Sequence, residues 1–146
     1  MTSTPPLDDI NRHVIEDFRA NNGAVDGAMG GFFAGKPVLI LHNTGAKTGK
    51  QRLTPLVYAT HDGRYVVAAT KGGSPNHPHW FLNVRAHPEV VVEVGTERFP
   101  AKATIIGDGP YRDELYAKLV ATMDQFAEYE TKTDRRIPVI VLERAE

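Results

Sequence analysis

The sequence predicts a mainly β fold of the α+β class, an antiparallel barrel that carries a few helices. Three observations favour this fold. Short runs of β-branched and aromatic residues recur along the chain. Most of them are joined by turn residues and not by helical crossovers, and the apolar spacing changes to that of a helix in only a few places. The 146 residues favour a single domain over 1–146, with about six strands and three helices.

The first element is an amphipathic helix. Val14, Ile15 and Phe18 have the spacing of one helical face, which predicts a helix over residues 11–21. Asn22 and Gly23 end it, and further glycines up to position 35 predict a loose, mobile connector. Helix and connector together cover about residues 11–36.

Strands follow wherever β-branched residues lie between turns. Residues 38–41, 53–60 and 64–70 are such runs, and we expect them to form a three-stranded meander through turns at 44–50 and 61–63. Residues 89–94 and 97–106 predict a hairpin around Gly95-Thr96, and residues 138–143 predict a last strand.

Two further helices are expected between these strands. Residues 78–86 place Trp80, Phe81 and Val84 on one face, and His87-Pro88 closes that helix because proline restrains the residue before it. The longest helix starts near Pro110. Its predicted buried stripe consists of Leu115, Leu119, Met123 and Phe126.

Composition excludes several classes of function. The chain has no cysteine, so disulfides, thiolate nucleophiles and Cys-ligated metals are ruled out. A formal charge of −1 argues against nucleic acid as a partner. No apolar run is long enough for a bilayer, and residues 1–9 lack the pattern of a signal peptide, so we expect a cytoplasmic protein without stable membrane insertion.

The turn Asn43-Thr-Gly-Ala-Lys-Thr-Gly-Lys-Gln-Arg52 is the most informative segment for function. No acidic residue occurs between Asp26 and Asp62, whereas lysines and an arginine gather there. Glycines, hydroxyls and cations together suit a phosphate group. The spacing differs from a Walker loop, because Lys50 stands where that motif needs its second glycine. From the residues alone, a solvated hairpin decorated with lysines explains the turn equally well.

Other candidate residues lie nearby in the chain. Lys71 follows a predicted strand, where a loop can wrap around a ligand. Trp80, beside His79 and with Asn83 three residues on, could stack on or hydrogen-bond a flat heterocycle, although a tryptophan more often fills the core. The only histidine cluster has no recognised metal-binding spacing, so no metal is expected.

Four blocks resemble one enzyme family. They are LILHNTGAKTGKQRLTPL (39–56), VAATKGG (67–73), PHWFLNVRAHP (78–88) and RIPVIVL (136–142), and their order is that of the deazaflavin (coenzyme F420)-dependent nitroreductase family. The segment FRANNG (18–23) is similar to the branch that reduces quinones and enones. This resemblance implies a split β-barrel, related to flavin-mononucleotide-binding oxidoreductases, with the deazaflavin lying in a groove.

The resemblance also implies positions for the cofactor. Residues of the basic turn would hold its phosphate and acidic tail, the end of the 64–70 strand would line its ring, and the 78–86 helix would form the adjoining wall. The implied cofactor-binding set is Lys47, Thr48, Gly49, Lys50, Gln51, Arg52, Pro55, Ala68, Ala69, Thr70, Lys71, His79, Trp80 and Asn83.

The implied reaction transfers a hydride from reduced coenzyme F420 to a small-molecule acceptor, which is an activated alkene, a quinone or a nitro compound. Family members that reduce nitroimidazoles carry several tyrosines on the last helix, where this chain has Met123, Phe126 and Tyr129. Tyr129, Tyr65 or solvent could supply the proton. Two alternatives stay open: an oxidoreductase that uses flavin mononucleotide, and a non-enzymatic deazaflavin-binding protein. A homodimer is compatible with the resemblance.

Overall fold

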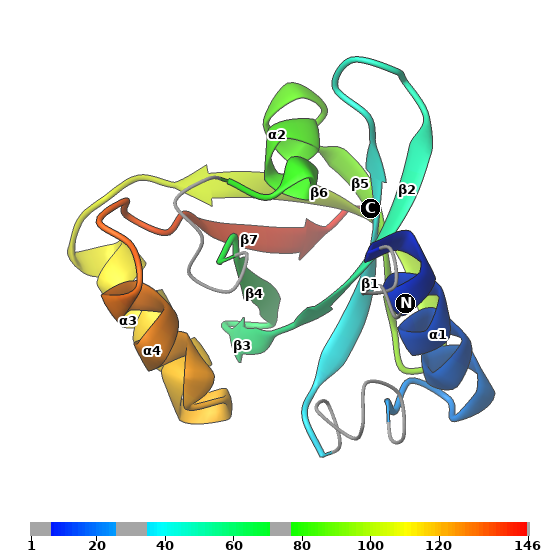
Figure 1. Ribbon diagram of the computed structural model, residues 1–146, viewed down its shortest axis with the longest axis horizontal. Helices are drawn as coiled ribbons and strands as arrows, with labels where there is room; N and C mark the ends of the chain where they lie inside the picture. The colour runs from blue at the N-terminus through cyan, green and yellow to red at the C-terminus, as the bar shows by residue number, and fades with distance from the viewer. Residues whose placement is uncertain (1–6, 26–34, 71–76, 146) are drawn as a thin grey trace, which may run out of the picture.

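The computed structural model describes residues 7–25, 35–70 and 77–145 (Figure 1). The described helices are α1 (Leu7–Ala20), α2 (His79–Ala86), α3 (Pro110–Thr122) and α4 (Gln125–Thr131). The described strands are β1 (Val38–Thr44), β2 (Gln51–Val57), β3 (Ala59–His61), β4 (Arg64–Ala68), β5 (Glu89–Val94), β6 (Glu97–Ile106) and β7 (Val139–Arg144).

All described strands belong to one antiparallel sheet that curls into a split barrel. Its strand order is β2-β1-β5-β6-β7-β4-β3, and every pairing is antiparallel. Figure 1 shows α1 beside the β1–β2 hairpin, α3 and α4 together at the opposite side, and α2 next to the upper end of that hairpin. The α+β class and the antiparallel barrel expected from the sequence are therefore confirmed.

The expected meander of residues 38–70 is wrong. The segment 53–60 forms two strands, β2 and β3, which lie at opposite edges of the sheet. The chain leaves β2 at Tyr58, whose N–H donates to the carbonyl oxygen of Pro37 at 3.1 Å. Because a bend between two extended stretches keeps the apolar spacing of a strand, the sequence pattern did not reveal it.

The first helix begins at Leu7, earlier than the spacing predicted. Its chain leaves through Gly23, which has φ +98° and packs on the β5–β6 turn. A Cβ atom at Gly23 would lie 2.4 Å from the Cα of Gly95, so only glycine allows this close approach. The predicted connector continues through 26–34, which lie outside the described residues.

The predicted long helix is broken into α3 and α4. Met123 is extended, with φ −149° and ψ 115°, and its backbone ends α3. The break is held by Tyr116, whose hydroxyl donates to the carbonyl oxygen of Phe126 at 2.6 Å. The expected apolar stripe is confirmed, because Leu115, Leu119, Met123 and Phe126 are all buried.

The sheet separates two apolar cores. One face packs on α1, α3 and α4, and Val66 and Ala68 of β4 belong to it. The other face packs on α2, and Val67 and Ala69 belong to that core. Because neighbouring side chains of a strand point to opposite faces, β4 contributes to both cores.

Candidate functional site

The basic turn between β1 and β2 has a defined backbone conformation. The N–H of Gly45 donates to the carbonyl oxygen of Lys50 at 2.8 Å, and that of Gly49 donates to the carbonyl oxygen of Gly45 at 2.9 Å. Gly49 has φ +70°. A Cβ at Gly45 would lie 2.5 Å from Oγ1 of Thr48. The backbone of this turn therefore favours glycine at position 49, whereas a side chain at position 45 would displace the hydroxyl of Thr48.

This turn presents donors to solvent. Lys47, Thr48 and Lys50 are exposed, and the N–H of Lys50 donates to Oγ1 of Thr48 at 3.2 Å. Within the part of the chain that the structure describes, the amides of Lys47 and Thr48 donate to no protein group, and the ammonium groups of Lys47 and Lys50 form no ion pair. Two amides and two cations at one tip suit an anion such as a phosphate.

Next to the turn, a groove separates α1 from β2. It has a volume of about 390 Å³, and Arg12, Arg19, Gln51 and Arg52 are among its lining residues. The amide nitrogen of Gln51 also donates to Oγ1 of Thr44 at 2.9 Å, which closes the base of the hairpin. Glu16 also lines this groove, and Arg12 and Arg19 pair with Glu16 and Glu93, so Arg52 is the cation that β2 itself contributes. Pro55 lies farther along this strand, where it pairs with Ile40 and is half-buried.

Asn83 does not face an open site, because its side chain fastens the turn to α2. Its Oδ1 accepts the N–H of Ala46 at 2.9 Å, and its Nδ2 donates to Oδ1 of Asn43 at 2.8 Å. Asn43 is 1% exposed, and its own Nδ2 donates to Oγ1 of Thr54 at 3.2 Å. Sequence reasoning missed Asn43, although an asparagine inside an apolar strand is a signal for a buried polar contact.

The other two residues expected on α2 have different environments. Trp80 is buried in the core of the α2 face with Phe81 and Val84, so it fills the core, as a tryptophan most often does. His79 is exposed at the first position of α2. Of this pair, only His79 has its side chain at the surface.

The end of β4 carries the residues expected beside the ring. Ala68 and Ala69 are buried in opposite cores, so only their backbone groups could contact a ligand. The N–H of Ala69 donates to the carbonyl oxygen of Pro138 at 3.0 Å. Thr70 is half-buried, and among the described residues its amide and hydroxyl have no hydrogen-bond partner. Lys71 lies outside the described residues.

Arg135 also lies at this strand end and was not predicted. Its Nη2 donates to the carbonyl oxygens of Ala69 at 3.1 Å and Thr70 at 2.9 Å, and its Nη1 lies 3.2 Å from Nδ1 of His77. Burial lowers the pKa of His77, and the positive charges of Arg135 and Arg85 lower it further.

Helix α2 connects the two parts of the candidate site. His77, just before α2, meets the end of β4 through Arg135, and Asn83 meets the basic turn. His79 and Asn83 are separated by four helical residues, about 6 Å along the axis. The chain from His77 to Asn83 thus links the cationic turn to the end of β4.

The two candidate tyrosines lie on opposite faces of the sheet. Tyr65 packs with Phe99 on the α2 side, and it stands at the other end of β4, roughly 16 Å along the strand from Thr70. Tyr129 packs edge-on against Phe126 on the α3–α4 side, in the core that includes Ala68. Burial raises the pKa of Tyr129, and nearby Glu128 raises it further, so its phenol is protonated at neutral pH.

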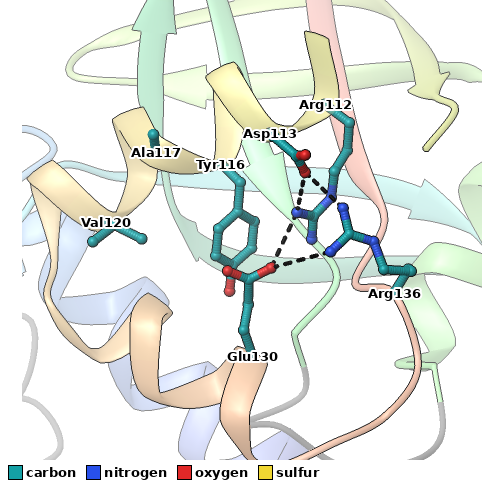
Figure 2. Close-up of a pocket in the computed structure, with 7 residues that line it drawn as sticks. All are labelled: Arg112, Asp113, Tyr116, Ala117, Val120, Glu130 and Arg136. Atoms are coloured by element: carbon teal, nitrogen blue, oxygen red, sulfur yellow. Dashed lines mark hydrogen bonds and ion pairs between the residues drawn. The ribbon is translucent and has the colours of Figure 1, made fainter. Parts of the chain in front are cut away.

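A separate cavity of about 370 Å³ lies between α3, α4 and the chain before β7 (Figure 2). Arg112, 3% exposed, contacts Oδ1 of Asp113 and Oε2 of Glu130 at 3.0 Å each. Arg136 contacts Oδ1 of Asp113 at 2.6 Å. The two arginines and two carboxylates that line this cavity balance in charge, and the Arg112–Glu130 ion pair links α3 to α4.

Across residues 7–25, 35–70 and 77–145, no group of three His, Asp or Glu side chains is placed to hold a metal ion. None of the helices in these ranges is both long and apolar enough to cross a membrane.

The fold and the site together define a class of protein: a split barrel whose cationic turn, between β1 and β2, is hydrogen-bonded to helix α2. Residues 11–144 match the model of one family, described as F420H(2)-dependent quinone reductase, and the chain belongs to this family. The deazaflavin resemblance is thereby confirmed, with quinone reductases as the family shown. Its description favours coenzyme F420 over flavin mononucleotide.

Individual relatives agree with this assignment. The F420H(2)-dependent quinone reductase Rv1261c of Mycobacterium tuberculosis is 36% identical over 132 residues, which cover 87% of this chain and 85% of the relative. A solved F420-H2-dependent reductase (FDR-A) is 41% identical, with a TM-score of 0.67 over 73% of this chain and 94% of its own. Another solved structure, a domain-swapped dimer, is 35% identical, with a TM-score of 0.69 over 88% of this chain and 95% of its own.

Proposed function

We propose that this chain reduces quinones with a hydride from reduced coenzyme F420, which it holds between the basic turn and the end of β4. Membership of the quinone reductase family supports the reaction. One observation supports the location. Asn83, within α2, contacts the cationic turn at Ala46, and His77, just before α2, contacts Arg135, which bonds to the end of β4.

The residues of the turn fit the acidic part of such a cofactor. The amides of Lys47 and Thr48 point to no described protein group, and the side chains of Lys47, Lys50 and Arg52 supply positive charge. Charge-assisted hydrogen bonds to a phosphate are worth about 1.5 to 3 kcal/mol each. We therefore assign phosphate binding to the turn, with the groove along Gln51 and Arg52 open to a longer acidic tail.

At the other end, the protein must orient the ring and exclude water. When bound, the reduced deazaflavin supplies the hydride. Thr70 offers an amide and a hydroxyl without described protein partners, and Ala68 and Ala69 present backbone with no side chain in the way. The end of β4 has small side chains, and its backbone is held by hydrogen bonds to Pro138 and Arg135, so a flat ring can approach it closely.

For the proton that accompanies the hydride, we propose Tyr129 in preference to Tyr65. Tyr129 lies on the face of β4 that includes Ala68, and its raised pKa keeps it protonated. Tyr65 lies at the far end of the strand. We assign Tyr129 the task of donating a hydrogen bond, and finally a proton, to the quinone oxygen.

A two-stage experiment tests this function. Oxidised coenzyme F420 and flavin mononucleotide are titrated separately into the protein, and the fluorescence of Trp80 and of each ligand is followed. We expect saturable, salt-sensitive binding of the deazaflavin, and faster oxidation of reduced F420 when a quinone is added. Binding without turnover with any quinone, enone or nitro acceptor would leave a cofactor carrier, and binding of flavin mononucleotide alone would overturn the cofactor assignment.

We also propose that the chain can form a homodimer. The related chain solved as a domain-swapped dimer supports this proposal. Light scattering coupled to size exclusion tests it, and a monomer mass over a wide range of protein concentration would refute it.

A further inference from the structure

Arg135 lies at the β4 end of the proposed site, and no sequence motif assigned it a role. It comes from the segment that precedes β7, yet its guanidinium reaches β4 and the chain entering α2. Its Nη2 donates to the carbonyl oxygens of Ala69 and Thr70, at 3.1 and 2.9 Å, and its Nη1 lies 3.2 Å from Nδ1 of His77. One planar group thus joins three backbone segments.

The geometry of these contacts uses the shape of arginine. A guanidinium carries five N–H donors in a rigid plane, so it can serve two carbonyls and a ring nitrogen at the same time. A lysine at position 135 would carry the same charge on a single nitrogen and could not span the three acceptors. The contact therefore depends on the planar set of N–H donors, called the fork below, as well as on the positive charge.

The contact with Arg135 also fixes the tautomer of the neutral His77 ring. Because a guanidinium only donates, Nδ1 of His77 must accept, and the neutral ring then carries its proton on Nε2. Among the described residues, the charged groups that act on this ring are Arg135 and, from α2, Arg85. The ring also packs on Phe81, with centroids 4.7 Å apart, which fixes its plane against α2.

We infer that Arg135 is a positioning residue for coenzyme F420, because its guanidinium fixes the backbone of Ala69 and Thr70 against the start of α2. This inference rests on the proposed function, since it concerns the same site. The carbonyl oxygens at the end of β4 are aimed at Arg135, which leaves the amide and hydroxyl of Thr70 as the groups of this end that are available to the ring.

Three variants distinguish the positioning role of Arg135 from an effect of its charge alone and from a loss of overall stability. Arg135→Gln removes the fork and the charge, and Arg135→Lys removes the fork alone. Arg136→Gln is the matched control, because it removes the same charge one residue further on, where the side chain bonds to Asp108 and Asp113 instead. Each variant is titrated with oxidised coenzyme F420, and its thermal unfolding is recorded without cofactor.

We expect both Arg135 variants to bind the deazaflavin about tenfold or more weakly, because several charge-assisted hydrogen bonds are lost. Arg136→Gln should bind as the unmodified protein does. An Arg135→Lys variant with unchanged affinity would overturn the inference, since charge alone would then suffice. An Arg135→Gln variant that binds like Arg136→Gln would overturn it as well. If Arg135→Gln does not fold, the comparison of Arg135→Lys with the control decides.

A readout without cofactor distinguishes failure of this inference from failure of the proposed function. Nitrogen NMR of the imidazole should find the proton of neutral His77 on Nε2, and its pKa should rise towards the ordinary value in Arg135→Gln but not in Arg136→Gln. A proton on Nδ1 in the unmodified protein would refute the Arg135–His77 contact. No deazaflavin binding by the unmodified protein, with the NMR result as expected, would overturn the proposed function instead.

Discussion

Replacement of Asn83 by leucine tests whether this residue shapes the site or only contacts the cofactor. Leucine has a similar volume but neither accepts the N–H of Ala46 nor donates to Oδ1 of Asn43. The lost hydrogen bond to Ala46 costs about 1 kcal/mol, and leaving the buried oxygen of Asn43 without its donor costs about 1 to 3 kcal/mol. We therefore expect Asn83→Leu to lose about 2 to 4 kcal/mol of stability without any cofactor present.

This loss can be measured by thermal or urea unfolding of the cofactor-free protein. For a chain of 146 residues, each kcal/mol lowers Tm by about 2 to 4 °C, so a fall of roughly 5 to 15 °C is expected. Because the turn is no longer fastened to α2, affinity for coenzyme F420 should fall as well.

Asn83→Asp is the matched variant. Its carboxylate still accepts the N–H of Ala46 but repels Oδ1 of Asn43, so it should destabilise the protein at neutral pH. Protonation restores a donor, hence the destabilisation should shrink as pH falls through the pKa of the new carboxyl group. If Asn83→Leu keeps full stability and loses only cofactor affinity, Asn83 is a ligand contact, and its hydrogen bonds to Ala46 and Asn43 do not fasten the turn to α2.

Three further predictions concern other parts of the molecule. Arg52→Ala should weaken F420 binding by about 1 to 3 kcal/mol, and added salt should weaken binding to the unmodified protein in the same direction, as measured by fluorescence titration. Burial alone would raise the pKa of Glu93, but hydrogen bonds from Arg19 and His42 outweigh it, so the pKa is lowered. The resulting stability is present above the ordinary pKa of 4.5 and is lost as pH falls through the lowered value, and urea unfolding of Glu93→Gln should lack this acid dependence. Tyr129→Phe should lower kcat for quinones while leaving F420 affinity unchanged, as measured by steady-state oxidation of reduced F420.

Each of these predictions has an outcome that contradicts it. If Arg52→Ala binds coenzyme F420 as tightly as the unmodified protein at both low and high salt, Arg52 is not part of the site. A Glu93→Gln variant that keeps the full acid dependence would show that other carboxylates cause it. Full quinone turnover by Tyr129→Phe would leave solvent as the proton source.

Much of the fold follows from local patterns, because the helices and hairpins are encoded by short-range spacing. The strand Glu97–Ile106 has the bounds that its residues predicted, and the stripe of the last helices is buried as expected. What failed was the placement of β2 and β3, since the bend at Tyr58 depends on a hydrogen bond to Pro37, twenty-one residues earlier. Such a contact leaves no periodic signal.

The candidate site divides in the same way. The basic turn could be identified because glycines and cations are contiguous in the sequence. Asn83 was selected as a residue of the site but with a different role, because a side chain that bonds a backbone amide resembles one that bonds a ligand. Arg135 could not be found, since its three partners come from residues more than fifty positions away in the chain.

The pairing of β4 with β7 has a consequence for how the molecule is made. Tyr65 is opposite Leu142 in this pair. Strand β4, which is proposed to meet the cofactor ring, therefore cannot complete its pairing until β7 has been synthesised, more than seventy residues later. Until then the nascent chain has only the short β3 to cover β4, and the other edge of β4 is available to wrong partners. We therefore expect folding to be slow relative to helical proteins of this length, and the cofactor-binding form to arise late, after β7 has left the ribosome.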